Sequence, residues 1–96
     1  MIQLGAKFSV SYHSDVVRFD IKKLPNSIKG RVKSAIENKL MVEPELFGLP
    51  LRKSLKGYRK LRVGDYRTVF KIVGKIVKVI LIQHRRDVYK NAHKRF

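Results

Sequence analysis

The segment from His84 to Tyr89 gathers side chains that could act on a phosphodiester. It reads HRRDVY, so a histidine, two arginines and a tyrosine stand within six residues. RNA supplies its own nucleophile, the 2′-hydroxyl; an enzyme needs a base to take its proton, cations to stabilise the phosphorane-like state and an acid for the departing 5′-oxygen. Lysine, arginine and tyrosine could fill these roles, and the planar fork of arginine bonds two phosphate oxygens. The alternative is a plain helix start, with Asp87 as its N-cap and Tyr89 packed below it.

Four further basic residues are predicted to share one face of a β-hairpin. Two runs with strand periodicity, residues 58–63 and 66–73, flank a tight turn at Gly64. Side chains alternate along a strand, and the larger apolar set, which includes Phe70, is expected to face the core. The opposite, solvent-exposed face is then expected to carry Lys60, Arg62, Arg67 and Lys71. Such a patch suits RNA binding, whereas an ordinary solvated sheet face is the alternative.

The composition leaves out several kinds of catalytic and structural site. The chain contains no cysteine, which excludes disulfide scaffolds, thiolate zinc sites and cysteine nucleophiles. It has no GxxxxGK[ST] phosphate loop, and its 7 acidic residues are too scattered to suggest a carboxylate-bound two-metal nuclease. His84 and His93 stand nine residues apart, outside the usual spacing of metal ligands. We therefore expect chemistry without a metal ion or another cofactor.

The positive charge is concentrated in the second half of the chain. Of 96 residues, 23 are Lys or Arg and 7 are Asp or Glu, which gives a net charge of +16. Residues 1–48 hold 8 basic and 5 acidic side chains, or +3, whereas residues 49–96 hold 15 basic and 2 acidic ones, or +13. Such an imbalance favours a polyanion as partner, nucleic acid first of all, and is compatible with an acidic protein.

The elements that must position these side chains begin with a strand and two helices. Residues 7–12 alternate as a short strand, and residues 14–24 fit an amphipathic helix that Pro25 ends. Residues 26–40 carry the apolar stripe of a second helix. Residues 41–56 are rich in proline and glycine and are predicted to form a loop.

After the hairpin, a third strand and a helix complete the predicted order βααβββα. Residues 76–82 are nearly all apolar, as in a central strand covered on both faces, and residues 88–95 are predicted to form a terminal helix. This order indicates an α+β fold with a small, mainly antiparallel sheet and an N-terminal helical hairpin packed on one face. No apolar run approaches the about 18 residues of a membrane helix, and the start lacks a signal-peptide pattern. We expect one domain, residues 1–96, in the cytoplasm.

The hairpin and the late segment together resemble the RelE/ParE superfamily of toxins from toxin–antitoxin modules. The family pattern is a basic residue two before Arg, a Gly-Asp-Tyr-Arg turn and a late His-Arg-x-x-x-Tyr. Here these are KLRVGDYR, from Lys60 to Arg67, and HRRDVY, from His84 to Tyr89. The resemblance covers most of the chain and implies a single RelE-like toxin domain.

RelE-type members of the family are mRNA endonucleases that act in the ribosomal A site and leave a 2′,3′-cyclic phosphate or the 3′-phosphate derived from it. The resemblance thus implies a ribosome-dependent mRNA endoribonuclease that needs no metal ion and contacts 16S ribosomal RNA. It also implies an acidic antitoxin that wraps and neutralises the toxin. The implied catalytic residues are Lys60, Arg67, Arg85 and Tyr89. The implied RNA-binding residues are Arg62, Lys71, His84 and Arg86.

One departure from the family pattern leaves the general base open. Many RelE-type members carry further basic residues ahead of the position of Lys60, where this chain has Tyr58 and Arg59. Lys60 and Tyr89 are both candidates for the base, and His84 is a candidate acid–base group. ParE-type members share the fold but bind DNA gyrase and cleave no RNA, so gyrase inhibition is the alternative function, beside an inactive RNA-binding relative. The set of implied catalytic residues favours cleavage.

Overall fold

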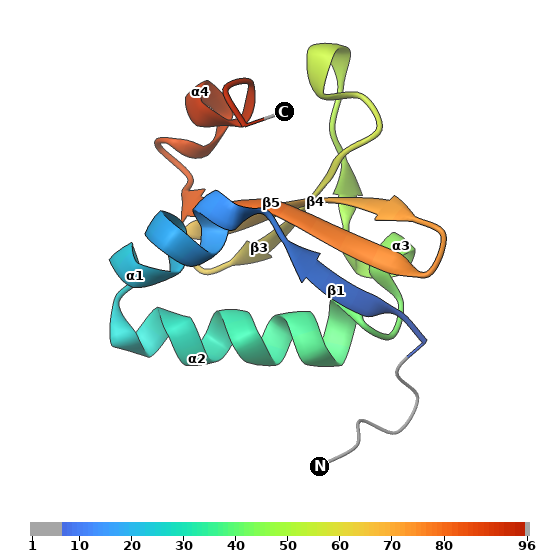
Figure 1. Ribbon diagram of the computed structural model, residues 1–96, viewed down its shortest axis with the longest axis horizontal. Coiled ribbons are helices and arrows are strands. Elements are labelled where there is room, and N and C mark those ends of the chain that lie inside the picture. Colours follow the sequence, from blue (N-terminus) through green and yellow to red (C-terminus); the bar gives the residue numbers. More distant parts are fainter. Residues whose placement is uncertain (1–6, 96) are drawn as a thin grey trace.

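The computed structural model describes residues 7–95, which form a five-stranded sheet flanked by helices (Figure 1). The strands are β1 (Ser9–Tyr12), β2 (Leu49–Pro50), β3 (Arg59–Val63), β4 (Tyr66–Val73) and β5 (Ile76–His84), in the spatial order β1-β5-β4-β3-β2. β1 runs parallel to β5, and the other neighbouring pairs are antiparallel. Gly64 and Gly74 in the two hairpin turns have φ angles of 60° and 59°, left-handed values that glycine adopts without a steric penalty.

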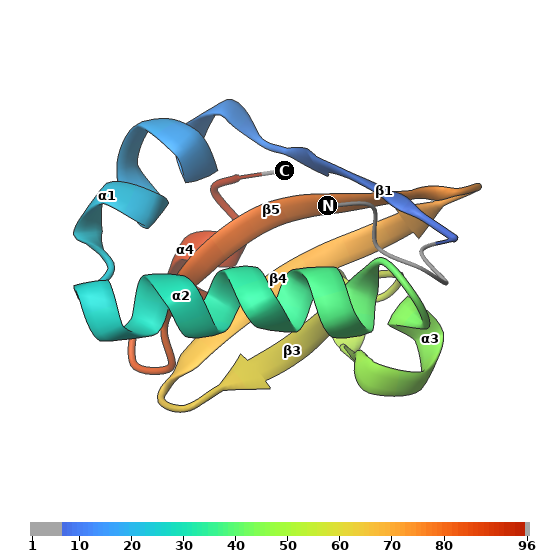
Figure 2. The same ribbon diagram turned by 90° about the horizontal axis from the view of Figure 1, so that it is seen from below.

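Helices lie on both sides of this sheet. On one side, the helical turn η1 (Val16–Asp20) leads into α1 (Ile21–Lys23), and α2 (Asn26–Ala35) continues as the turn η2 (Ile36–Leu40). Figure 2 shows α2 lying across the sheet on this side, with the short helix α3 (Pro44–Phe47) beyond its end. On the other side lie the 3₁₀ turn η3 (Lys53–Leu55) and α4 (Val88–Ala92), above the sheet in Figure 1.

Each face of the sheet has its own apolar core. The larger core lies under the N-terminal helices and includes Leu40 of η2, Phe70 of β4 and Val79 of β5. The smaller core joins the sheet to α4 and η3 and consists of Leu55, Val69, Leu81, Val88 and Ala92. β5 contributes side chains to both cores, as expected for a central strand covered on both faces.

The α+β fold with a mainly antiparallel sheet is confirmed, and so are the predicted helices and strands outside residues 41–56. The loop predicted over residues 41–56 is wrong, because this segment contains α3, β2 and η3. Several ends also differ. The first strand begins at Ser9, the first helix spans residues 16–23 and the first hairpin strand begins at Arg59. The strand predicted over residues 76–82 extends to His84, and the terminal helix ends at Ala92.

The prediction that the face opposite the N-terminal helices is exposed to solvent holds for Arg62 and Lys71 and is wrong for the middle of that face. Val69 is fully buried there and Arg67 is only 7% exposed. The grouping of residues on that face is confirmed by the strand register, in which Arg62 pairs with Arg67 and Lys60 with Val69. The alternation of side chains along the strands could not predict the burial of this face, because the side chains that cover it come from α4 and η3.

Candidate functional site

Lys60 and Tyr89, far apart in the sequence, are in direct contact. Lys60 is supplied by β3 and Tyr89 by the start of α4. The Lys60 ammonium Nζ donates a hydrogen bond to the Tyr89 hydroxyl oxygen at 2.9 Å and lies 5.5 Å from the centre of the phenol ring. Tyr89 is 39% exposed, so a ligand can reach the pair from solvent. A cation and a group able to transfer a proton therefore share one accessible position.

Arg67 is folded back onto the turn that precedes it. Its Nη1 donates hydrogen bonds to the carbonyl oxygens of Gly64 and Tyr66, both at 2.9 Å. A tight turn leaves carbonyl groups without partners in the strand ladder, and a buried guanidinium satisfies two of them here. Arg67 thus holds the shape of the turn, and only a small part of its side chain reaches solvent. Its cross-strand partner Arg62 is exposed.

Arg85 joins the end of β5 to the same turn. Its backbone N–H donates to the carbonyl oxygen of Asp65 at 2.8 Å, and its Nε lies 3.8 Å from Asp65 Oδ1. The two side chains are 62% and 67% exposed, so solvent screens this ion pair and it contributes little stability. The Arg85 guanidinium is therefore free to exchange Asp65 for another anion.

The other predicted RNA-binding residues are distributed over both faces of the sheet. His84 pairs with Tyr66 in the strand register and their rings meet edge to face at 5.3 Å. Since Tyr66 packs against the core under the N-terminal helices, His84 lies on the face opposite to Lys60. Lys71 shares the face of Lys60, with its Nζ 5.5 Å from the centre of the Tyr58 ring. Arg86 is exposed just beyond β5.

A buried ion pair that the sequence analysis did not predict holds the segment after α4 against β5 and η1. Asp20 of η1 is 3% exposed and accepts hydrogen bonds from Arg95 Nη1 at 2.6 Å and from the backbone N–H of Ile82 at 2.9 Å. Arg95 also donates to the carbonyl oxygen of Ile80 at 3.2 Å. The chain after α4 is thereby tied to β5 and to η1, which determines where Tyr89 stands.

One signal for this ion pair was available in the sequence. Asp20 stands four residues after Val16, on the apolar stripe of the first predicted helix, and a carboxylate at such a position needs a buried partner. Its partner Arg95 is 75 residues away, and no local pattern identifies it.

Residues 7–95 contain no group of three His, Cys, Asp or Glu side chains placed to hold a metal ion. Within the same residues, no helix has both the length and the apolar character needed to cross a membrane. Among the groups of this region, Tyr12 has a perturbed acidity: partial burial, and secondarily the negative charge of Glu37, raise the pKa of its phenol. Tyr12 lies in β1, outside the site around Lys60.

Comparisons with known proteins agree on one family. A family model described as "ParE toxin of type II toxin-antitoxin system, parDE" matches residues 13–89. The toxin RelG of Mycobacterium tuberculosis is 35% identical over 75 residues, which cover 76% of this chain and 86% of RelG. The part of this chain that the family model matches includes β3, β4, β5 and the segment up to Tyr89.

Solved structures give the same picture. A chain in the toxin–antitoxin complex RelBE2 of Mycobacterium tuberculosis superposes with a TM-score of 0.76 at 31% identity, and 82% of this chain and 99% of that chain are covered. A chain in the RelB–RelE antitoxin–toxin complex of Methanococcus jannaschii gives a TM-score of 0.63 at 26% identity, with 82% and 94% covered.

Proposed function

The chain belongs to the RelE/ParE superfamily of toxins of type II toxin–antitoxin modules, and on that basis we propose that it is an mRNA endoribonuclease that uses the RNA 2′-hydroxyl as its nucleophile. The observation that carries this proposal is the hydrogen bond from Lys60 Nζ to the Tyr89 hydroxyl at 2.9 Å. It joins a cation to a proton-transfer group, and the exposed Arg62 stands two residues from Lys60 on the same strand. The proposal extends to cleavage in the ribosomal A site, in the cytoplasm, without a metal ion.

In the proposed reaction the 2′-oxygen attacks the adjacent phosphorus, and the bond between them forms as the bond from phosphorus to the 5′-oxygen breaks. A base takes the 2′-hydroxyl proton and an acid gives a proton to the 5′-oxygen, so the products are a 2′,3′-cyclic phosphate and a 5′-hydroxyl. Tyr89 transfers one of these protons. Lys60 stabilises the negative charge on the Tyr89 oxygen while its proton is absent, because the ammonium already donates to that oxygen.

The arginines are proposed to stabilise the phosphorane-like state. Arg85 can leave its exposed pairing with Asp65 for a phosphate oxygen, and Arg62 is exposed on the strand next to Arg67. The Nη1 of Arg67 is occupied by turn carbonyls, so a phosphate would meet the remaining N–H groups of its guanidinium. More distant RNA contacts are proposed for Lys71, His84 and Arg86.

An acidic antitoxin is the proposed protein partner. The similar chains from Mycobacterium tuberculosis and Methanococcus jannaschii were both solved in toxin–antitoxin complexes. A net charge of +16 favours a partner of opposite charge. Val17 and Phe19 of η1 are about half exposed and offer apolar surface that such a partner can cover.

Inhibition of DNA gyrase is the second candidate, because the matching family model is named for ParE. ParE-type toxins share the fold and act by binding gyrase. That function gives no reason for a lysine to be held against a tyrosine hydroxyl on an exposed surface, and this contact is why we place RNA cleavage first.

Mapping the 3′ ends of cellular mRNA after brief induction separates the two functions. We expect new 3′ ends within coding regions, and we expect Tyr89→Phe to abolish most of them. Tyr12→Phe is the matched control, because it removes a phenol hydroxyl from β1, outside the site around Lys60, and should leave the cleavage pattern unchanged. Broken chromosomal DNA without new mRNA ends would favour gyrase inhibition instead.

Two finer features of the proposal need preassembled ribosome complexes. Single-turnover cleavage of an A-site message, compared with cleavage of the same RNA free in solution, tests dependence on the ribosome. Replacing magnesium by cobalt hexammine, which offers no inner-sphere coordination, tests independence from a metal ion. Intact complexes that no longer support cleavage after this exchange would require a metal mechanism.

A further inference from the structure

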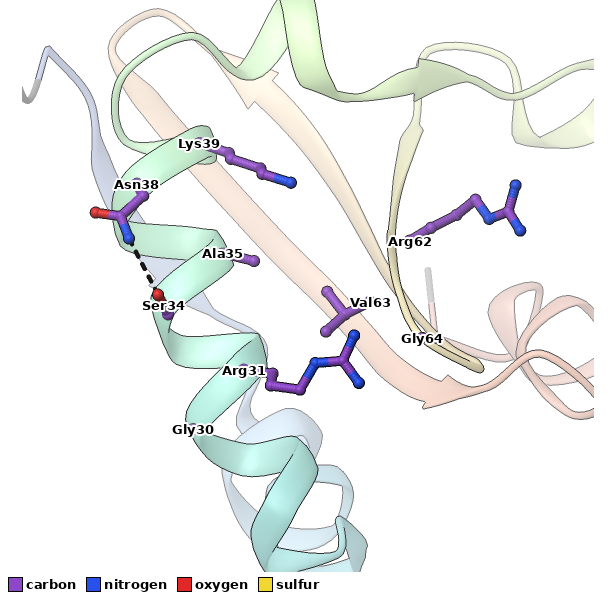
Figure 3. A pocket seen from close by; sticks show the side chains of 9 residues that line it. All are labelled: Gly30, Arg31, Ser34, Ala35, Asn38, Lys39, Arg62, Val63 and Gly64. Atoms are coloured by element: carbon purple, nitrogen blue, oxygen red, sulfur yellow. Dashed lines mark hydrogen bonds between the residues drawn. The ribbon is translucent and has the colours of Figure 1, made fainter.

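A cleft of about 410 Å³ lies between α2 with η2 and the outer edge of β3, next to the turn at Gly64. We propose that this cleft binds phosphate groups of an RNA backbone. The proposal rests on the function proposed above, since it takes RNA as the ligand, and it adds a binding surface separate from the position of Lys60 and Tyr89. Figure 3 shows the cleft with Arg31 and Lys39 extending from the helix side towards β3, whereas the Arg62 side chain extends from β3 away from the helix.

The first argument is charge. Arg31 and Lys39 extend into the cleft from the helix, Arg62 borders it from β3, and none of the acidic residues that the structure describes lines it. Within residues 7–95, none of these three cations forms an ion pair with a carboxylate. Lys39 Nζ lies 5.6 Å from the centre of the Phe47 ring, which leaves its charge uncompensated. Cations gathered without counter-charges repel one another, and a bound anion removes that cost.

The second argument is the shape of the walls. A Cβ added at Gly30 would meet nothing within 4 Å, so the helix backbone is open to a ligand there. A Cβ added at Gly64 would lie 3.2 Å from Arg31 Nη1, which shows that the Arg31 guanidinium rests against the turn. The guanidinium is thus held at one end of the cleft, where its planar fork can bond two phosphate oxygens.

The third argument separates RNA from an acidic polypeptide as the occupant. Ala35 and Val63 are the only apolar side chains that line the cleft, among the residues the structure describes. A second groove of about 430 Å³ lies on the other flank of α2 and is lined mostly by apolar side chains, including Val17, Ile21 and Ile36. A protein partner that buries apolar side chains fits that groove, whereas the cleft offers charge and little apolar surface.

The fourth argument is continuity with the proposed cleavage position. Lys60 and Arg62 stand two residues apart on β3, about 6–7 Å along the strand, with side chains on the same face. Arg62 also borders the cleft. An RNA strand that crosses the edge of β3 therefore passes from Lys60 to the cleft. The phosphates belong either to the message being cut or to ribosomal RNA beside it.

The test uses two double variants that each remove two charges from the same helical segment. The cleft variant carries Arg31→Gln and Lys39→Gln. The matched control variant carries Lys29→Gln and Lys33→Gln, at two residues that line the apolar groove instead. The first probe is a 2′-O-methyl RNA oligonucleotide, which has no nucleophile and is not cut. At moderate salt we expect the cleft variant to bind it about tenfold or more weakly and with a salt slope smaller by about 1.4, or about 0.7 for each lost phosphate contact. The control should change affinity by less than about threefold.

A charge-preserving variant, Arg31→Lys with Lys39→Arg, checks the result against a folding defect. It should keep the salt slope of the wild type if the cleft binds phosphates through charge. Circular dichroism and thermal melts compare the folding of all three variants.

The source of the phosphates is found with ribosomes as the second probe. If the cleft variant loses affinity for the free oligonucleotide, the phosphates belong to the message; if it loses affinity only for vacant ribosomes, they belong to ribosomal RNA.

A wild type that cleaves RNA while the cleft and control variants behave alike overturns this inference and leaves the proposed function standing. A cleft variant that loses affinity for the antitoxin but not for RNA also overturns it. A wild type that binds neither RNA nor ribosomes overturns both.

Discussion

Lys60 and Tyr89 are the two residues on which the proposed chemistry depends most directly. Their contact is exposed, so its contribution to the free energy of unfolding is small. Removing either side chain should therefore change the rate of cleavage far more than the stability of the fold.

A double-mutant cycle on this pair tests whether Lys60 acts through the phenol oxygen. Tyr89→Phe should lower the single-turnover rate by about 10²–10³, because proton transfer by a positioned side chain contributes about this much. Lys60→Gln should lower the rate by at least about tenfold. The double variant should be little slower than Tyr89→Phe alone, since one step has lost both participants. Losses that multiply in the double variant would show that Lys60 acts independently of Tyr89.

Arg67 differs from Lys71 although both lie on one face of β4. Arg67→Ala should lower the free energy of unfolding by about 2–4 kcal/mol, because two turn carbonyls lose a charged donor at a buried position. Lys71→Ala should cost less than about 1 kcal/mol, since its side chain is exposed and its ammonium lies over the Tyr58 ring. Denaturant unfolding measures both values.

The rate of cleavage separates a catalytic role of Arg67 from a structural one. On fully folded protein, we expect Arg67→Ala to lower the single-turnover rate by about 10²–10³ and Lys71→Ala by less than about tenfold. Arg67→Lys should recover only part of the rate, because an ammonium lacks the planar fork. A stable Arg67→Lys variant with the full wild-type rate would limit Arg67 to holding the turn.

At the scale of the elements, periodic segments were predictable and short ones were not. β4, β5 and α2 follow from alternation and from the apolar helical stripe, which are local properties. β2 and α3 span two and four residues, too few for a pattern. They depend instead on distant contacts, such as the hydrogen bond from Arg59 Nη1 to the carbonyl oxygen of Gly48 at 2.9 Å.

The candidate site was predictable to a similar extent. The motif residues indicated that the hairpin and the segment after β5 act together, and Lys60 does meet Tyr89. The burial of Arg67 was not predictable, because its guanidinium folds back onto the carbonyl groups of its own turn. Beside it, Val69 is buried because it and Leu81 form a second core with Val88 and Ala92 of α4. Strand alternation alone treats that face as solvated, and only the packing of α4 shows otherwise.

The ion pair between Arg95 and Asp20 makes the position of α4 testable. Arg95→Gln leaves a buried carboxylate without its cation, which should lower the free energy of unfolding by about 3–5 kcal/mol. The exposed neighbouring change Lys94→Gln should cost less than about 0.5 kcal/mol.

Arg95→Gln should also slow cleavage, although the residue lies outside the proposed chemistry, because α4 carries Tyr89. Compared with the wild type, the variant should show faster hydrogen exchange at the amides of α4. The amides of β4 should change less. Unchanged exchange in α4 together with a lower rate would mean that Arg95 acts on cleavage by another route.

At the scale of the whole molecule, the two flanks of α2 have different surfaces. One flank faces the basic cleft with Arg31 and Lys39, and the other faces the apolar groove with Val17 and Ile21. The basic cleft thus attracts an anionic partner over a long range, whereas the apolar groove binds a partner through buried apolar surface at short range. An acidic antitoxin should use both, charge while it approaches and apolar contact once it is bound.

This division predicts how salt affects association with the proposed antitoxin. Raising NaCl from about 50 mM to about 500 mM should lower the association rate constant by about 100-fold, because a chain of net charge +16 steers an acidic partner only while its field is unscreened. The dissociation rate constant should change by less than about tenfold, since apolar contacts determine how long the complex lasts.

Stopped-flow mixing measures the association rate, and a variant of the apolar groove supplies the complementary case. Val17→Ser removes exposed apolar surface without changing charge. It should raise the dissociation rate constant and leave the salt dependence of association unaltered, because the two rates report different parts of the surface. An association rate that does not respond to salt, or a Val17→Ser complex that dissociates at the wild-type rate, would contradict this division and place the antitoxin elsewhere on the toxin.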